Sequence, residues 1–390
     1  MPAMKFGEIK ERLKEFRSAA ESVREILLAN AVMVAEIPAP TFREAQRVRF
    51  IEDRFSECGL QNCSTDEVGN GFGILNGDPG EKQILLVAHA DTVFDEKADH
   101  TIAMLSDRMT GPGVGDNSLG LAVLASLPIL LEKLQIRLKS NLLLMAASRS
   151  LGRGNLEGLR FFLNNNRQPI ASALCVEGVK LGRLSYSSIG MLRGEINVHV
   201  SEMYDWTRFG AAGAIITLND VINKINRIPL PKRPKTSIVL GTIEGGTSYN
   251  NIATHSRLRF EIRSESAEIV NAIHEEINDR ITEIALETSA EVTLDIIARR
   301  EPGGIDFRHP LVRRSRDILK ALQIEPRVAP STSELAELIR HEIPAITLGL
   351  TTGTNLNQVN EEVLINPIFD GVAQLLGLLI AMDEGLCDEH

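Results

Sequence analysis

The most constraining feature of this 390-residue sequence is an alternation of continuous apolar segments with helical patterns. Three apolar runs of strand length cover residues 83–88, 140–147 and 171–177, and helical patterns over 118–131 and 156–165 stand between them. Strands that are apolar on both faces are typical of parallel sheets covered by helices on both sides. Such sheets bind ligands at the carboxyl ends of their strands, so the residues that follow each run are the candidates for a functional site.

The pattern changes near residue 187 and returns after residue 300. Between these points the order strand, helix, two strands, helix, strand fits the split βαβ plan. We therefore expect an α/β domain with a mostly parallel sheet sandwiched by helices, formed by residues 1–188 and 299–390. Residues 189–298 are expected to form an inserted, ferredoxin-like α+β domain. Apolar residues at helical spacing over 5–31 predict one N-terminal helix.

Net charge, the length of the apolar runs and the cysteine count limit the classes of partner and the cellular location that we expect. The net charge is −10, so we expect no nucleic-acid partner. The continuous apolar runs are shorter than the about 20 residues that span a bilayer, so we expect no membrane partner. The four cysteines stand at no metal-finger spacing and are too few for a disulfide scaffold, which favours a cytoplasmic location.

Four side chains that can carry chemistry stand at the ends of the apolar runs. His89 and Asp91 point the same way in a strand, and a carboxylate beside a histidine can orient it for a metal. Asp116 lies in a glycine-rich turn at the mouth of a helix, and Glu177 ends the third run. Taken singly, these are also explained as a structural histidine, an ordinary turn and a solvated strand end. Together, one imidazole and two carboxylates suit a zinc ion with an open fourth position.

Longer motifs, spread over nearly the whole chain, carry a family resemblance. They are IPAPTFRE at 37–44, AHAD at 88–91, GPGVGD at 111–116, Glu177, GGTSYNNIA at 245–253 and FEIRSES at 260–266. With them the chain resembles the co-catalytic zinc peptidases and amidohydrolases, a family that includes aminoacylase, glutamate carboxypeptidase, acetylornithine deacetylase and succinyl-diaminopimelate desuccinylase. The resemblance implies a zinc-exopeptidase-like fold. It also implies that the inserted domain is a lid that forms a homodimer.

The resemblance implies a two-zinc site and assigns the residues of its first metal by position. His89, the bridging carboxylate Asp116 and Glu177 would hold that metal. Asp91 would orient His89 from behind. The ligand expected from the family is a small peptide or an N-acyl amino acid.

The chain departs from the family at the other catalytic positions. Where the family has a general base and a ligand of the second metal, the chain has Ser148 and Arg149. Asn357 replaces a C-terminal histidine ligand, and Tyr204 replaces the lid histidine that stabilises the oxyanion. A guanidinium only donates hydrogen bonds and cannot bind a metal, so a second zinc is not expected. Arg149 can instead pair with Asp116 and replace part of the missing charge.

Two lid residues match the family's substrate-binding surface. Asn250 and Arg263 would meet a carboxylate or a backbone group of the ligand, and an arginine fork suits a carboxylate. A turn residue and an ion pair inside the lid explain these two positions equally well.

The sequence therefore predicts a metallopeptidase or amidohydrolase homologue with a degenerate metal site. It would hold at most one zinc or other divalent metal per chain, or none. We expect weak or no hydrolysis of peptide and N-acyl amino acid bonds, with binding of a carboxylate-bearing ligand as the remaining role. Two alternatives stay open: an active enzyme with one zinc, and a structural protein whose dimer is its purpose. Whether the chain is an enzyme is left undecided, because the general base and the second-metal ligands are missing.

Overall fold

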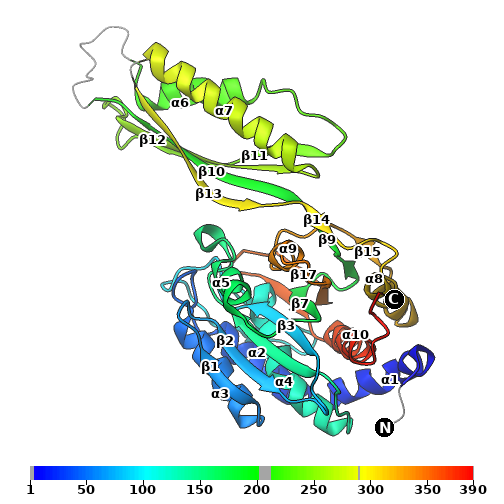
Figure 1. Cartoon of the computed structure of the whole chain (residues 1–390). Helices are drawn as coiled ribbons and strands as arrows, with labels where there is room; N and C mark the ends of the chain where they lie inside the picture. The colour runs from blue at the N-terminus through cyan, green and yellow to red at the C-terminus, as the bar shows by residue number, and fades with distance from the viewer. Residues whose placement is uncertain (1–3, 202–211, 289, 390) are drawn as a thin grey trace. The chain divides into compact units, whose positions relative to one another are not determined.

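The computed structural model describes residues 4–201, 212–288 and 290–389. The chain divides into two compact units. The larger unit comprises Met1–Ser188 and Gly304–His390, and the smaller unit is the continuous segment Ile189–Gly303 between them (Figure 1). Each unit has a hydrophobic core of its own.

A six-stranded sheet forms the centre of the larger unit. Its strands, in spatial order, are β1 (Gln61–Thr65), β2 (Gly71–Leu75), β6 (Asn141–Ala147), β3 (Gln83–His89), β7 (Ser172–Val179) and β16 (Ala345–Thr351). Only β2 runs against the others, since it pairs antiparallel with both β1 and β6. The strands β3 and β7 are buried along their whole length. The prediction of a mostly parallel, doubly covered sheet is confirmed.

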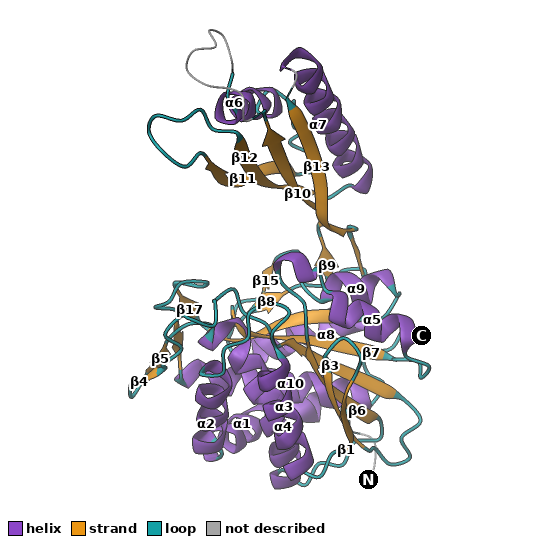
Figure 2. Cartoon of the chain, turned by 90° about the vertical axis from the view of Figure 1, so that its left-hand side faces the viewer, coloured by secondary structure: helices purple, strands orange, loops and turns teal. Residues whose placement is uncertain are grey.

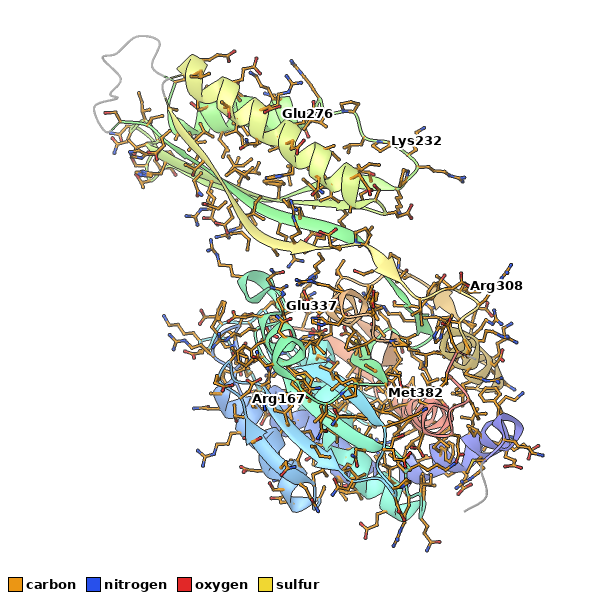
Figure 3. All side chains as sticks on the ribbon, viewed as in Figure 1. Arg167, Lys232, Glu276, Arg308, Glu337 and Met382 are labelled. Atoms are coloured by element: carbon orange, nitrogen blue, oxygen red, sulfur yellow. The ribbon has the colours of Figure 1, made fainter. Side chains whose placement is uncertain are left out.

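Helices cover both faces of this sheet, as the alternation along β3 shows. Ile84 and Leu86 pack in the cluster formed with α1, α2, α3, α4, α8 and α10, whereas Leu85 and Val87 pack on the other face with α5 and α9. Met382 of α10 lies in the first cluster, while Arg308 is exposed on the surface (Figure 3). The helices are α1 (Phe6–Ser22), α2 (Arg24–Ala35), α3 (Ala45–Glu57), α4 (Leu119–Lys133), α5 (Glu157–Asn165), α8 (Pro310–Ala321), α9 (Leu335–Arg340) and α10 (Asn366–Asp383).

Short elements complete the larger unit. They are β4 (Ala103–Met104), β5 (Arg108–Thr110), the π-helical turn Val114–Ser118, the 3-10 turn Gly152–Gly154, β8 (Arg183–Leu184), β9 (Ser187–Ser188), β15 (Arg327–Val328), β17 (Gly353–Thr354) and β18 (Glu362–Leu364). The strand β14 (Gly303–Gly304) spans the boundary between the two units. The strands β17, β18, β5 and β4 form a second small sheet, and β15 pairs in parallel with β8.

The N-terminal segment differs from its prediction. The single helix expected over 5–31 is wrong, because the chain leaves helical geometry at Val23 (φ −109°, ψ 18°) between α1 and α2. The apolar spacing continues through the break, since residues on both sides of it face the same core. Periodicity of side chains therefore does not reveal a kink of one residue.

The described residues of the smaller unit form a four-stranded antiparallel sheet with two helices. The sheet order is β11 (Thr236–Gly245), β12 (His255–Ser264), β10 (Gly190–His199), β13 (Glu291–Arg300). The helices α6 (Ala214–Ile225) and α7 (Ala267–Thr288) cover one face of it (Figure 2). The ferredoxin-like plan is thereby confirmed. The other face carries charged side chains joined by ion pairs, such as that between Arg259 and Glu195 at 3.1 Å.

Within the part of the chain that the structure describes, one helical stretch, Val114–Lys133, is long and apolar enough to cross a membrane. Within it, 89% of the most apolar window is buried inside the structure, as in the core helix of a soluble protein. Continuous apolar runs alone were considered in the sequence analysis, so this longer helical stretch was not identified there. The absence of a membrane partner stays a prediction.

Candidate metal centre

The three predicted ligands of the first metal meet at the carboxyl ends of neighbouring strands. His89 is the last residue of β3, Glu177 lies near the end of β7, and Asp116 lies in the turn that leads into α4. One ligand atom from each of the three lies within 4.8 Å of the other two. The parallel order of β3 and β7 produces this meeting, because neighbouring parallel strands end at the same edge of the sheet.

Hydrogen bonds fix the orientation of the His89 ring. Its Nδ1 lies 3.0 Å from the carbonyl oxygen of Asp91, which can only accept, so Nδ1 carries a hydrogen. Its other ring nitrogen, Nε2, lies 3.0 Å from the carboxylate oxygen Oδ1 of Asp116. Burial by itself would lower the pKa of His89, but the hydrogen bonds to Asp116 and Asp91 raise it well above the ordinary value. A metal ion would replace the proton between Nε2 and Asp116.

Asp91 is completely buried behind His89. Its Oδ1 lies 3.5 Å from Nδ1 of His89. Its Oδ2 accepts hydrogen bonds from Oγ1 of Thr41 at 2.8 Å and from the backbone N–H of Leu151 at 2.7 Å. These donors hold the carboxylate in the position that an orienting group needs.

The two carboxylates of the trio have opposite electrostatic environments. Burial raises the pKa of Glu177 to about 7, and the negative charges of Asp116 and Glu334 act in the same direction against His89. Burial also acts to raise the pKa of Asp116, but the hydrogen bond and the charge of His89 lower it below the ordinary value. Two carboxylates this close together, Glu177 buried and Asp116 partly exposed, favour a cation between them.

Asn117 joins the turn that contains Asp116 to β7 through two hydrogen bonds. This role was not identified in the sequence analysis. Its Nδ2 donates to the carbonyl oxygen of Val176 at 2.7 Å, and its Oδ1 accepts from the N–H of Gly178 at 2.8 Å. The approach is close, since a Cβ at Gly178 would lie 2.1 Å from the carbonyl oxygen of Gly115. An asparagine directly after the aspartate of a glycine-rich turn is the signal that could have revealed this role.

Glu361 supports the same turn from the C-terminal segment and was also missed. Its Oε1 accepts from the N–H groups of Gly115 at 2.7 Å and Asp116 at 2.9 Å, and its Oε2 accepts from the N–H of Asn357 at 3.1 Å. Glu361 is completely buried, and burial raises its pKa to about 7. A glutamate gives no sequence signal for such a role, because exposed glutamates look the same in a pattern of apolar and polar residues.

Ser148 and Arg149 follow β6 but turn their side chains into other contacts. The Ser148 hydroxyl donates to the carbonyl oxygen of Val68 at 2.9 Å, and the residue is 1% exposed. The Arg149 guanidinium forms an ion pair with Glu157 at 2.7 Å. The expected pairing of Arg149 with Asp116 is wrong, because the guanidinium pairs instead with Glu157, the first residue of α5.

Asn357 lies in an exposed loop with φ 64°, and its backbone N–H donates to Glu361. Among the described residues, no hydrogen bond joins its side chain to the trio, so its replacement of a histidine ligand stays a prediction. Tyr204 lies outside the described residues.

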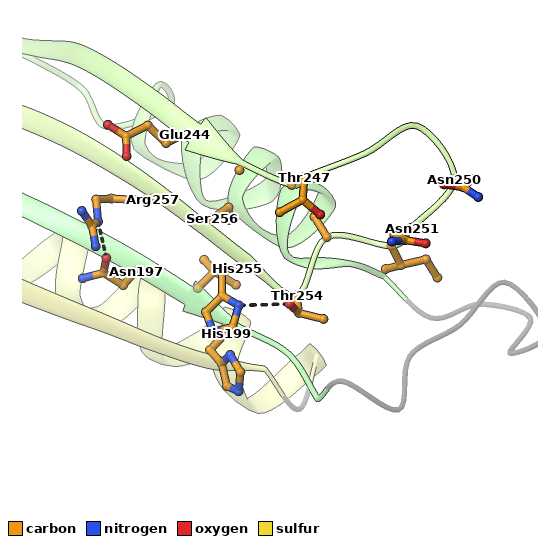
Figure 4. Close-up of a pocket in the computed structure, with 15 residues that line it drawn as sticks. Asn197, His199, Glu244, Thr247, Asn250, Asn251, Thr254, His255, Ser256 and Arg257 are labelled. Atoms are coloured by element: carbon orange, nitrogen blue, oxygen red, sulfur yellow. Dashed lines mark hydrogen bonds between the residues drawn. The ribbon is translucent and has the colours of Figure 1, made fainter.

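The two predicted lid residues lie in different places within the smaller unit. Asn250 lines a cavity of about 670 Å³ beside β10 and β12, together with His199, His255 and Arg257 (Figure 4). Arg263 lies on β12 and forms an ion pair with Glu261. It is not among the described residues that line this cavity. The ion pair inside the lid is the explanation that fits Arg263 in this structure.

Comparison with known proteins supports the resemblance. Residues 207–289 match the model of the peptidase dimerisation domain of the M20 family. The chain carries the M20 dimerisation domain and has the fold of the M20 metallopeptidases. No protein of curated function matches it in sequence.

Solved structures of the M20 fold share little sequence with the chain but nearly its whole length. The dipeptidase Dug1p from Saccharomyces cerevisiae has a TM-score of 0.78 at 13% identity, with 95% of this chain and 98% of that one covered. Human carnosine dipeptidase 1 has a TM-score of 0.75 at 11% identity, covering 95% and 99%. The YXEP protein of Bacillus subtilis, described as a dinuclear metal-binding peptidase, has a TM-score of 0.65 at 13% identity, covering 93% and 99%.

Proposed function

We propose that this M20-fold chain binds a single divalent metal, zinc by preference, at His89, Asp116 and Glu177. The observation that carries the proposal is the convergence of these three ligand atoms within 4.8 Å, on a histidine whose Nδ1 is already engaged. Three protein ligands of this type, with one open position, are typical of catalytic zinc sites. The YXEP protein is described as dinuclear, whereas in this chain an arginine (Arg149) and an asparagine (Asn357) stand at the positions where ligands of a second metal are expected.

We further propose that the site binds its ligand without efficient hydrolysis. A bound divalent metal lowers the pKa of a coordinated water to about 7. A positioned general base adds a further factor of about 10²–10⁴, and Ser148 cannot supply it because its hydroxyl is buried and donates to Val68. The ligand class that fits the fold is a small peptide or an N-acyl amino acid.

The dimerisation domain supports a homodimer formed through the smaller unit. The free thiols of all four cysteines fit the cytoplasmic location that we propose.

Calorimetric titration of zinc into chelator-treated protein tests the proposal. We expect one binding site per chain, which disappears in His89→Ala. The variant His274→Ala, which changes a histidine of α7 in the smaller unit, should bind zinc like the parent. Two zinc sites per chain, or full zinc binding by His89→Ala, would contradict the assignment.

One alternative has an observation in its favour: an active enzyme with one metal. The trio offers a complete set of three ligands, and such a set is enough for a catalytic zinc. A screen of dipeptides and N-acyl amino acids with zinc, cobalt and manganese separates the two functions. Turnover that disappears in His89→Ala supports the enzyme, and no turnover with any metal supports the binding function.

A further inference from the structure

Three positively charged side chains surround one cavity in the larger unit, directly after β7. Lys180 stands in the turn between β7 and β8, Arg183 begins β8, and Arg327 begins β15. The cavity measures about 240 Å³ and is lined by Lys180, Leu181, Arg183, Arg327, Ala329 and Pro330. We call these six residues the cationic pocket.

The two arginines of the cationic pocket are register partners. Arg183 and Arg327 lie opposite each other in the parallel pair of β8 and β15. Neighbouring strands are about 4.8 Å apart, and like charges directly opposite each other destabilise a sheet. An oxyanion between the two guanidinium groups would offset this repulsion, because arginine binds carboxylate and phosphate through strong charge-assisted hydrogen bonds.

The protein does not supply that anion from its own described side chains. Arg183 donates from Nε to the hydroxyl of Ser185 at 2.6 Å, which leaves both of its Nη groups for another partner. Within residues 4–201, 212–288 and 290–389, none of the three cations of the cationic pocket has an ion pair with an acid. This is notable in a chain of net charge −10, which has acidic side chains in excess.

The cationic pocket adjoins the metal centre. Glu177 precedes Lys180 by three residues, at the end of the same strand. Lys180 and Arg183 follow the strand that carries Glu177, so the cationic pocket and the trio lie at the same end of β7. We expect one small ligand to reach both places.

We propose that the cationic pocket binds an oxyanion, the carboxylate or phosphate group of a small ligand. The proposal deepens the function proposed above, since it gives the ligand of the metal centre a negative group. It depends on that function only for the claim that one ligand reaches both places. Binding of an oxyanion by the pocket itself does not depend on a metal.

The first experiment measures inorganic phosphate binding by calorimetry to the full chain after chelator treatment, at low ionic strength. Hydrogen bonds to charged groups are strong enough that losing one guanidinium weakens binding by about tenfold or more. We expect this loss in Arg183→Gln and in Arg327→Gln, and partial recovery in Arg327→Lys, which keeps the charge. The matched control Arg308→Gln removes an exposed arginine elsewhere in the same unit and should bind phosphate like the parent.

The second experiment identifies the kind of oxyanion in the ligand. N-acetyl-L-glutamate and N-acetyl-L-glutamine have nearly the same size and differ by one charge. With zinc present, we expect the glutamate compound to bind at least about tenfold more tightly, and Arg183→Gln to abolish the difference. Equal binding of the two compounds, with phosphate binding intact, would assign the pocket to phosphate-bearing ligands.

The outcomes separate this proposal from the metal site. Phosphate binding that is equal in the parent, Arg183→Gln and Arg308→Gln, or absent from the parent, would overturn the cationic pocket. Failure of zinc to bind would overturn the proposed function but leave the phosphate result unchanged, because that titration contains no metal.

Discussion

Replacement of Glu361 by alanine tests how the turn of Asp116 is held. The variant leaves three backbone N–H groups, those of Gly115, Asp116 and Asn357, without their acceptor. An unsatisfied buried donor costs about 1–3 kcal/mol, so three of them lower the free energy of unfolding by about 3 kcal/mol or more. Residues that hydrogen-bond to metal ligands also affect the affinity for the metal. We therefore expect zinc binding by Glu361→Ala to weaken by about tenfold to a hundredfold.

The loss of stability in Glu361→Ala should depend on pH in a definite direction. Burial raises the pKa of Glu361 from 4.5 to about 7 in the folded chain. The contribution of this group is therefore complete below its unfolded pKa and is lost as the pH rises through the folded pKa. At about 1.4 kcal/mol per pKa unit, the difference between parent and variant should shrink by about 2 kcal/mol between about pH 5.5 and about pH 8.5.

Urea unfolding followed by circular dichroism measures these differences. Glu362→Ala is the matched control, because the neighbouring Glu362 pairs with Arg108 at 3.2 Å and is partly exposed. A pair of this kind contributes less than about 1 kcal/mol, with little change over the same pH range. Equal losses for the two variants, or a Glu361→Ala loss that grows with pH, would refute the reasoning.

Two further predictions concern the metal centre. Zinc affinity should fall at least about tenfold for each pH unit below about pH 7, because Glu177, with a pKa of about 7, and His89 must both lose a proton to bind the metal. Competition with an indicator chelator measures this affinity. A zinc affinity that does not change with pH would contradict the prediction. The double variant Arg149→Glu with Asn357→His should raise the metal content from one to two equivalents per chain, because it restores a carboxylate and an imidazole at the positions of the second-metal ligands. Elemental analysis measures this content. An unchanged metal content would show that the two positions are assigned wrongly.

The sequence predicted the parallel sheet and the lid because their signals are local. Continuous apolar runs such as 83–88 mark strands buried on both faces, and the change of pattern near residue 187 marks the inserted segment. The break at Val23 escaped prediction, since the residues on both sides of it face one core and keep the helical spacing.

The candidate site was predictable where residue type and strand position coincide. His89 and Glu177 stand where parallel strands end, Asp116 stands in a glycine-rich turn, and the structure brings the three together. The partners of Arg149 were not predictable in the same way, because the ion pair with Glu157 depends on how the turn after β6 folds back. The role of Glu361 depends on contacts between segments about 245 residues apart, which no local pattern encodes.

The most direct test of the account is an anomalous-difference map at the zinc edge, from crystals of protein loaded with excess zinc. We predict one peak per chain at the centre, bonded to Nε2 of His89 and to the carboxylates of Asp116 and Glu177. Two peaks about 3.5–4 Å apart, bridged by Asp116, would contradict the single-metal site. No peak among the three side chains would contradict metal binding altogether.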